Sequence, residues 1–191
     1  MAKGKLIILS GPSGVGKGTV RASLFEDESL NLAYSISMTT RFPRAGERDG
    51  IDYFFVSQEE FQRKIDEDGF LEYAQFVGNC YGTPKDYVDQ LLNDGKNVVL
   101  EIEVQGALQV MKKCPEALTI FLVPPSMDEL EKRIRGRRTE EEDIVRQRLD
   151  KAKREIATQN EYKYVVCNDD VEEAKNKIAK IIKMNANVLT K

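Results

Sequence analysis

The chain has 191 residues, of which 41% are hydrophobic and 32% are charged, so one folded domain with a real core is expected rather than a disordered or disulfide-rich chain. Lys and Arg number 29 against 32 Asp and Glu, and this slightly acidic balance argues against a general nucleic-acid-binding protein. The sequence has no histidine, which excludes every mechanism that needs an imidazole base, including the Ser-His-Asp triad.

The cysteines and the apolar runs bear on localisation. Cys80, Cys114 and Cys167 lack metal-type spacing and fit free thiols in a reducing compartment. The longest apolar runs, such as 6–9 and 98–100, are much shorter than a bilayer-spanning helix, and no apolar stretch typical of a secretory signal follows the N-terminal lysines. We therefore expect a cytoplasmic protein with neither a membrane nor a nucleic acid as partner, and the oligomeric state stays open.

Short apolar segments predict the strands of a sheet. They lie at residues 5–10, 97–102, 118–123 and 164–167. Each is followed by a helical pattern, the first of them over 17–26 and the last over 171–183. Buried strands that alternate with helices are typical of right-handed βαβ crossovers, so the sequence predicts an α/β fold with a parallel-sheet core flanked by helices.

A glycine-rich loop separates the first predicted strand from the first predicted helix. It matches the phosphate-binding pattern G-x-x-x-x-G-K with the residues Gly11, Pro12, Ser13, Gly14, Val15, Gly16 and Lys17. Glycines let successive backbone N–H groups turn toward phosphate oxygens, and the helix N-terminus and Lys17 add positive charge. A chance turn with a solvated lysine is the alternative, but the loop follows an apolar strand and opens a helix. The sequence thus predicts a nucleotide phosphate site.

The loop departs from the usual pattern at one position. Gly18 stands where Ser or Thr is usual, and Thr19 comes one residue later. A hydroxyl ligand for Mg²⁺ is therefore missing at the usual place. Nucleotide oxygens and waters would hold most of the ion's coordination sphere, which Mg²⁺ tolerates.

Residues 37–87 differ in composition from the rest of the chain. They are rich in glycine and in the aromatic residues Tyr53, Phe54, Phe55, Phe70, Tyr73, Phe76 and Tyr81. Their short alternating segments predict a small mixed or antiparallel sheet. We interpret 37–87 as an insertion into a core formed by 1–36 and 88–191.

Several helix starts are predicted from capping residues. The pairs Ser57 with Glu60, Ser126 with Glu129, and Thr139 with Glu142 fit the capping box. Thr83 followed by Pro84 predicts one more start, with the proline in the first helical position.

Two groups of arginines are candidates for phosphate binding. Arg41 and Arg44 lie three apart on a segment stiffened by Pro43, and two guanidinium groups can converge on one anion. Spacing alone leaves open that both are ordinary surface residues. Arginine is also dense between 131 and 154, where partners four residues apart, such as Glu131 and Arg135 or Glu142 and Arg146, predict a charged helix.

Taken in order, these motifs resemble those of guanylate kinases, a family of P-loop nucleoside monophosphate kinases. The resemblance covers nearly the whole chain and rests on 11–19, 37–47, 50–55, 70–74, 78–83, 101–106, 124–126, 136–140 and 168–170. It implies transfer of the terminal phosphate of ATP to GMP, and to dGMP, with Mg²⁺. It also implies a P-loop core, a GMP-binding insertion at 37–87 and a helical lid at about 130–150.

The resemblance further implies roles for individual residues. ATP would contact loop 11–19 together with Arg133 and Asn168. The GMP phosphate would contact Arg41, Arg44, Tyr53 and Tyr81, and guanine would lie among Ser37, Glu72, Thr83 and Glu103. Arg137 and Arg148 would meet the transferring phosphate, and Lys17 and Arg41 would complete the catalytic set. The family often has Asp where Glu101 and Glu103 stand, so which of the two serves the metal and which the base stays open.

The chemistry of guanine agrees with these roles. Its N1–H and N2 amine are donors that one carboxylate accepts together, and a hydroxyl can satisfy O6. A phosphate monoester is mostly dianionic at pH 7, so a GMP acceptor needs no histidine base. The alternatives are a P-loop kinase for another phosphorylated acceptor, which has no use for the guanine set, and an inactive phosphopeptide-binding module, which would not need Lys17.

Overall fold

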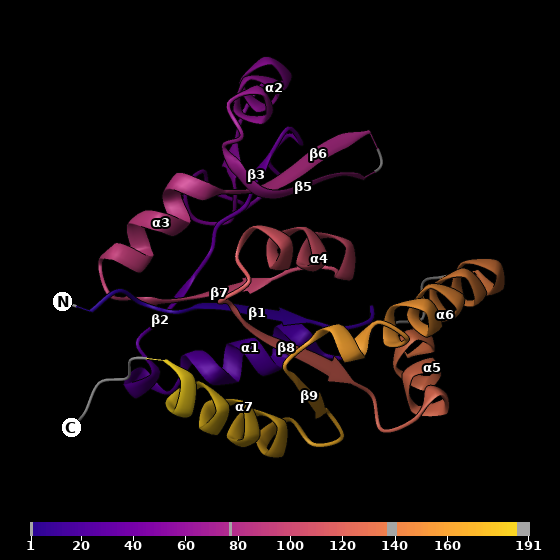
Figure 1. The fold of residues 1–191 in the computed structure, drawn as a ribbon. Coiled ribbons are helices and arrows are strands. Elements are labelled where there is room, and N and C mark those ends of the chain that lie inside the picture. The colour runs from indigo at the N-terminus through magenta and orange to yellow at the C-terminus, as the bar shows by residue number, and fades with distance from the viewer. Residues whose placement is uncertain (1, 77, 137–140, 187–191) are drawn as a thin grey trace.

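The computed structural model describes residues 2–76, 78–136 and 141–186, and its centre is a five-stranded parallel sheet (Figure 1). The strand order is β2-β7-β1-β8-β9, and all four pairings are parallel. The strands are β1 (Leu6–Ser10), β2 (Leu32–Tyr34), β7 (Asn97–Glu101), β8 (Leu118–Val123) and β9 (Tyr164–Cys167). The predicted parallel α/β core is confirmed, and β2 is a short, half-buried strand that the hydrophobic pattern did not reveal.

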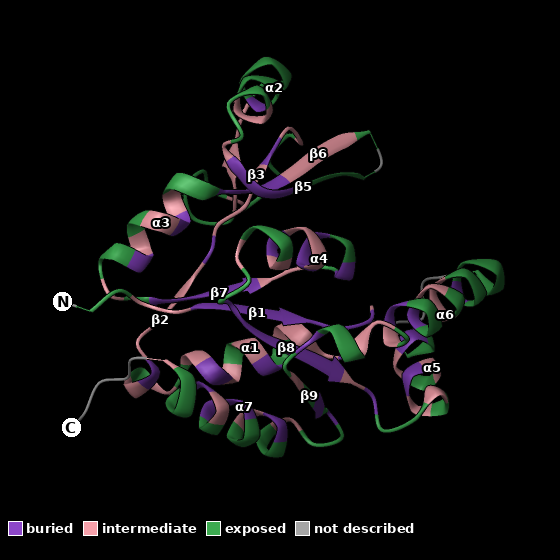
Figure 2. Ribbon diagram, viewed as in Figure 1, coloured by how far each residue is buried: buried purple, intermediate pink, exposed green. Residues whose placement is uncertain are grey.

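Helices cover both faces of this sheet, and successive residues of β1 alternate between them. Ile7 and Leu9 face α1 (Lys17–Phe25) and α7 (Val171–Asn185) in one apolar cluster. Leu6 and Ile8 face α3 (Lys85–Asn93) and α4 (Val104–Lys113) in the other. The alternation follows from the two-residue period of a strand, and it leaves the central strands almost wholly buried (Figure 2).

A second, smaller sheet stands above the α3 and α4 face (Figure 1). Its order is β4-β3-β6-β5, with β3 (Met38–Thr39), β4 (Phe54–Phe55), β5 (Phe70–Phe76) and β6 (Asn79–Pro84). The pairs β3–β6 and β5–β6 are antiparallel, whereas β3–β4 is parallel, so the sheet is mixed. Helix α2 (Gln58–Asp66) packs on it through the stacked rings of Phe61 and Phe70, whose centroids are 4.5 Å apart.

The arginine-rich segment forms two helices that pack together beyond the carboxyl ends of the strands. They are α5 (Met127–Arg135) and α6 (Glu142–Ile156), joined by a small apolar cluster that includes Leu130 and Val145. Arg135 contacts Glu131 at 2.7 Å as predicted. It also donates both Nη groups to Glu142, the carboxylate that the sequence had suggested for Arg146.

The helix starts show how far capping patterns predict boundaries. Ser57 and Glu60 form the complete capping box at α2, and the Ser126 hydroxyl accepts the Glu129 N–H at α5, while Thr139 lies outside the described residues. The start predicted at Thr83 is wrong by one residue. Pro84 ends β6 in an extended conformation (φ −64°, ψ 124°), so it is the N-cap and α3 begins at Lys85. None of the described helices has the length and apolar composition needed to cross a bilayer.

Asn97 ties together the beginnings of three strands and gives a stability prediction. Its buried side chain accepts the Lys5 N–H at 3.0 Å and donates to the Leu30 carbonyl at 2.8 Å. Asn97→Ala leaves the half-buried Lys5 N–H and the buried Leu30 carbonyl without these partners, so we expect a loss of about 2–4 kcal/mol in the free energy of unfolding. Denaturant titration measures it, with the exposed Asn93→Ala as control. A loss below about 1 kcal/mol would show that the bridge is dispensable.

Candidate active site

The glycine-rich loop lies between the carboxyl end of β1 and the N-terminus of α1. Gly14 and Gly16 have φ angles of 86° and 95°, a left-handed region that favours glycine. A Cβ at Gly16 would lie 2.7 Å from the Nδ2 of Asn168, so the loop at this point also requires the absence of a side chain. The predicted cradle therefore has the backbone that its glycines allow.

Lys17, the first residue of α1, turns its side chain back over the loop. Its Nζ donates to the carbonyls of Gly11 at 2.7 Å and Pro12 at 3.1 Å. Burial lowers the pKa of Lys17, and nearby carboxylates, that of Glu101 foremost, counteract part of this effect. The ammonium group is thus held at the mouth of the loop, where a phosphate would need a positive charge.

Asn168, which directly follows β9, is hydrogen-bonded to the backbone of the glycine-rich loop. Its Nδ2 donates to the Val15 carbonyl at 2.7 Å, and the side chain is buried. Arg133 of α5 donates to the backbone carbonyl of Asn168 at 2.9 Å. Both residues that were predicted for ATP therefore lie beside the loop, and their contacts with each other tie α5 to it.

Helix α6, which contains much of the predicted lid, also reaches the glycine-rich loop. The Nη2 of Arg148 donates to the hydroxyl of Ser13 at 2.8 Å, which brings a predicted catalytic arginine onto the glycine-rich loop. Arg137, the other lid arginine predicted for the transferring phosphate, lies outside the described residues.

A cavity of about 560 Å³ opens between the small sheet and the carboxyl edge of the large one. The predicted residues in its lining are Ser37, Tyr53, Glu72, Tyr81, Glu101 and Glu103. They come from segments far apart in the sequence, and the fold gathers them on one hollow. The predicted Thr83 is buried behind this wall, while Arg41 and Arg44 lie outside the lining.

Glu72 is the buried carboxylate of this cavity. Only 8% of the residue is exposed, and the Thr83 hydroxyl donates to its Oε1 at 2.6 Å. A Cβ at Gly106 would lie 2.8 Å from its Oε2, so the first turn of α4 packs directly against the carboxyl group. Burial raises the pKa of Glu72, and the hydrogen bonds from Thr83 oppose that rise.

The two open carboxylates, Glu101 and Glu103, face different partners. Glu101 accepts from the Nε of Arg21 on α1 at 2.6 Å and lies next to Gly18. Glu103, the N-cap of α4, accepts from the Nζ of Lys151 on α6 at 2.7 Å. Sequence reasoning missed Arg21 and Lys151, because both belong to charged helical faces whose direction depends on the tertiary fold.

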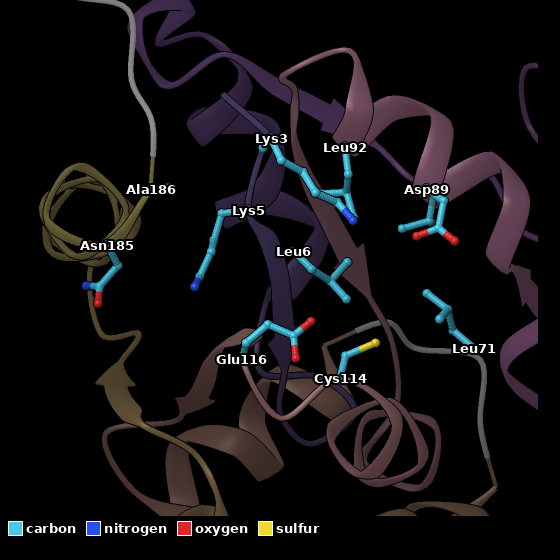
Figure 3. A pocket seen from close by; sticks show the side chains of 12 residues that line it. Lys3, Lys5, Leu6, Leu71, Asp89, Leu92, Cys114, Glu116, Asn185 and Ala186 are labelled. Carbon is cyan, nitrogen blue, oxygen red and sulfur yellow. The ribbon is translucent and has the colours of Figure 1, made fainter. Parts of the chain in front are cut away.

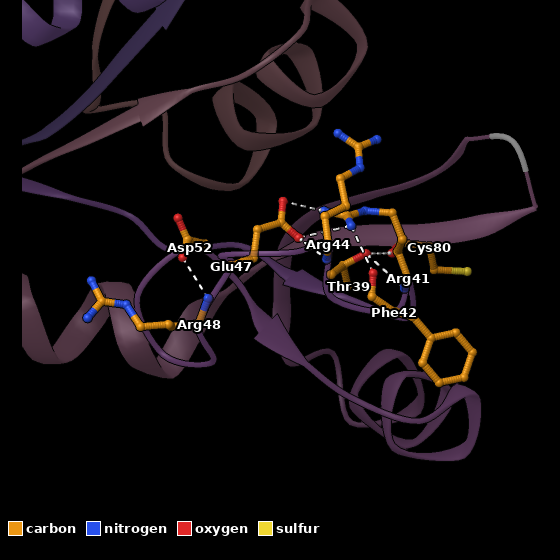
Figure 4. Close-up of polar contacts among 8 residues, drawn as sticks. All are labelled: Thr39, Arg41, Phe42, Arg44, Glu47, Arg48, Asp52 and Cys80. Carbon is orange, nitrogen blue, oxygen red and sulfur yellow. Dashed lines mark hydrogen bonds and ion pairs between the residues drawn. The ribbon is translucent and has the colours of Figure 1, made fainter.

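The two predicted phosphate-binding arginines share a third residue, Glu47 (Figure 4). The Arg41 guanidinium pairs with both carboxylate oxygens of Glu47, at 2.9 and 3.0 Å. It also lies 5.4 Å from the ring centroid of Tyr53, which in turn packs edge-on against Tyr81 at 6.2 Å. Residues 41–47, the arginine loop, are thereby joined to the two tyrosines that line the cavity. Glu47 was visible as the last residue of the R-x-P-R-x-G-E run but received no role from the sequence.

A different cavity of about 450 Å³ lies at the amino end of β1 (Figure 3). Its lining includes Lys3, Lys5, Leu6, Leu71, Asp89 and Cys114. None of the predicted site residues lines it. The predicted residues that do line a cavity line the one at the carboxyl edge of the large sheet.

The fold and the loop define the class of protein, an α/β P-loop domain with a second small sheet and the helix pair α5 and α6. The family model for guanylate kinase matches residues 3–185. A guanylate kinase of Latilactobacillus sakei subsp. sakei is 55% identical over 180 residues, which are 94% of this chain and 89% of that protein. The crystal structure of guanylate kinase from Anaplasma phagocytophilum superposes with a TM-score of 0.73 at 36% identity, covering 96% of this chain and 86% of that one.

The chain belongs to the guanylate kinase family. A guanylate kinase of Mycoplasma mycoides subsp. mycoides SC is 57% identical over 182 residues, 95% of this chain, yet the chain spans only 61% of that relative's length. The family resemblance predicted from the motifs is confirmed.

The contact between Thr83 and Glu72 predicts a measurable change of pKa. Thr83→Val removes the hydroxyl that stabilises the charged carboxylate, so the pKa of Glu72 rises further above its ordinary value. Carbon-13 NMR titration of labelled glutamate carboxyl groups measures it. Thr119→Val is the matched control, because the Thr119 hydroxyl is buried but accepts from the Lys163 N–H, away from the cavity. An unchanged pKa of Glu72 in Thr83→Val would contradict the assignment of the Thr83 hydroxyl as the donor that stabilises this carboxylate.

Proposed function

We propose that this protein is an active guanylate kinase, which transfers the terminal phosphate of ATP to GMP, and to dGMP, giving GDP and ADP. Its family membership supports the reaction class. The observation that carries the choice of acceptor is the cavity, in which the buried Glu72 with its Thr83 partner faces the same hollow as Tyr53 and Tyr81.

The guanine end of this proposal rests on donor and acceptor chemistry. The carboxylate of Glu72 accepts from the N1–H and N2 amine of guanine, and the hydroxyl of Ser37 is available to the base. Adenine presents an acceptor at N1 and would meet the carboxylate with its lone pair. Glu103, also in the lining, is the second carboxylate for the base.

The phosphate end rests on the arginine loop. Arg41 and Arg44 bind the GMP phosphate, with the hydroxyl groups of Tyr53 and Tyr81 at the same end of the cavity. In this arrangement the phosphate points away from Glu72 and toward the glycine-rich loop. Glu101 and Lys151 line the cavity on the side of the glycine-rich loop.

The transfer step needs no general base from the protein. An oxygen of the GMP phosphate, mostly dianionic at pH 7, forms a bond to the terminal phosphorus of ATP, while the bond from that phosphorus to the bridging oxygen breaks and ADP leaves with the electron pair. Lys17 and Arg148, together with Arg137, neutralise the charge on the transferring group. Loop 11–19, Arg133 and Asn168 hold ATP in place.

The residues near the loop suit a Mg²⁺ ion that accompanies ATP. Among the described residues no group of three or more acidic or thiol side chains could hold a metal by itself. The Oε1 of Glu101, however, lies 3.6 Å from the place that a Cβ at Gly18 would take, where the usual hydroxyl ligand is missing. Glu101 together with nucleotide oxygens and waters would hold the ion, which supplies positive charge to the phosphates.

The proposal divides the chain into three functional parts. In it, segments 1–36 and 88–191 are the ATP-binding core, 37–87 is the GMP-binding insertion, and about 130–150 is the lid; the separate second sheet supports this division. The cytoplasm, where ATP and GMP occur together, is the expected location.

A coupled ADP-release assay tests the function directly. With ATP as donor, GMP and dGMP should support turnover, whereas AMP, UMP and CMP should support little. Equal turnover with AMP would contradict guanine selection. Absence of turnover with all nucleoside monophosphates would favour another phosphorylated acceptor or a binding module.

Lys17 provides the test of the phosphate cradle. Lys17→Ala removes the ammonium group from the loop, and we expect kcat to fall roughly 100-fold or more because the charge acts on the transition state. Thermal melting checks that the fold persists. Lys180→Ala, on the exposed face of α7, is the control and should retain full activity. Undiminished kcat in folded Lys17→Ala would refute the assignment.

Glu72 provides the test of base recognition. Glu72→Gln places an amide donor against the donors of guanine, so kcat/KM for GMP should fall roughly thirtyfold or more while that for AMP does not fall. Arg44→Ala should instead weaken GMP and AMP alike, because both carry the phosphate. The measurement is the ratio of kcat/KM for GMP to that for AMP in each variant. If Glu72→Gln leaves the ratio unchanged, guanine is recognised elsewhere, with Glu103 as the next candidate.

A further inference from the structure

The carboxylate of Glu47 organises the arginine loop by accepting three hydrogen bonds. Its Oε1 accepts from the Nη2 of Arg41 at 2.9 Å, and its Oε2 accepts from the Nη1 of Arg41 at 3.0 Å. The same Oε2 accepts the backbone N–H of Arg44 at 2.7 Å. One side chain therefore fixes both arginines that are assigned to the GMP phosphate (Figure 4).

These bonds occupy a particular edge of the Arg41 guanidinium. Glu47 takes the edge formed by Nη1 and Nη2, and the Phe42 carbonyl takes a further Nη1–H at 2.8 Å. A guanidinium has five N–H donors in one plane. A side-chain hydrogen bond with Tyr81 also helps to raise the pKa of Arg41. The Nε–H and the remaining Nη2–H make a second parallel pair, on the edge that Glu47 and Phe42 leave unused. That edge suits a bidentate bond to a phosphate.

The backbone and the aromatic rings hold this arrangement in place. The Glu47 N–H donates to the Arg44 carbonyl at 3.0 Å, and the Glu47 carboxylate accepts the Arg44 N–H. Residues 44–47 therefore form a turn that is held by two hydrogen bonds. Gly46, with φ 91° and open space around a would-be Cβ, permits the turn. The rings of Tyr53 and Phe55 lie 5.4 and 5.9 Å from the guanidinium of Arg41 and limit its movement.

We propose that Glu47 is a positioning residue for the acceptor phosphate: it grips Arg41 by one edge so that the other edge faces the phosphate of GMP. This inference rests on the proposed function, because it takes GMP as the acceptor. Glu47 itself touches no substrate. Its effect passes through Arg41 and through the backbone of Arg44.

For the removal of Glu47, simple electrostatics and the positioning role predict opposite changes in GMP binding, which makes the inference testable. Glu47 is a negative charge next to the site of a dianion, so its removal would by charge alone favour GMP binding. If Glu47 instead acts by geometry, neutralising or shortening it must weaken GMP binding. A placeholder that GMP displaces from Arg41 would also give tighter binding when removed.

The experiment compares Glu47→Gln and Glu47→Asp with the unchanged protein in the ADP-release assay. Glu47→Gln loses the charge and one acceptor, whereas Glu47→Asp keeps the charge on an arm one methylene too short to reach all three donors. We expect KM for GMP to rise roughly tenfold or more in both, with KM for ATP unchanged and kcat altered less than about threefold. Asp52→Asn is the matched control, because the Asp52 carboxylate lies in the same loop and accepts the backbone N–H of Arg48, not a guanidinium N–H of Arg41.

The outcomes distinguish a failure of the positioning role of Glu47 from a failure of the proposed guanylate kinase activity. Loss of GMP turnover in the unchanged protein would refute the proposed function. With that turnover present, a KM for GMP that stays constant or falls in Glu47→Gln and Glu47→Asp overturns the positioning role. Asp52→Asn should match the unchanged protein. An equal rise of KM in Asp52→Asn would assign the effect to the loop as a whole and likewise overturn it.

Discussion

The parallel pairing of β1 with both β7 and β8 is the constraint on which the rest of the structure depends. The register Leu9 with Glu101 and Ser10 with Phe121 brings the carboxyl ends of these strands to one edge of the sheet. The faces of the sheet are covered by helices, so this edge is where polar groups on the strand ends can meet ligands. The glycine-rich loop follows β1 there, Glu101 ends β7 with Glu103 two residues later, and Asn168 follows β9.

A second constraint is the burial of Glu72. A carboxylate removed from water is costly unless it is hydrogen-bonded, and here Thr83 supplies one bond while Gly106 allows α4 to approach. The site thus keeps one acceptor pair oriented before any ligand arrives, which favours a partner with two adjacent donors. The positive charge proposed for the phosphate end comes from Arg41 and Arg44, which lie on a turn rather than in the core. The order of this turn depends on hydrogen bonds within residues 41–47.

Much of this was predictable because it depends on local patterns. The strands β1, β7, β8 and β9 are continuous apolar runs, and the loop motif follows from glycine geometry and one lysine. Strand β2 was missed because three half-buried residues carry too little periodicity. The partners Arg21 for Glu101 and Lys151 for Glu103 were not predictable, because 80 and 48 residues separate them and only the packing of α1 and α6 brings them together. The end of β6 at Pro84 similarly follows from its pairing with Phe70.

The central claim is that the two ends of one cavity recognise the two ends of GMP and direct its phosphate toward the loop at Lys17. A crystal structure with GMP and a non-hydrolysable ATP analogue tests this most directly. The account predicts guanine against the carboxylate of Glu72, the GMP phosphate on the Nε edge of Arg41, and the terminal phosphate of the analogue beside Lys17. GMP bound with its base away from Glu72, or with its phosphate facing away from the loop, would contradict it.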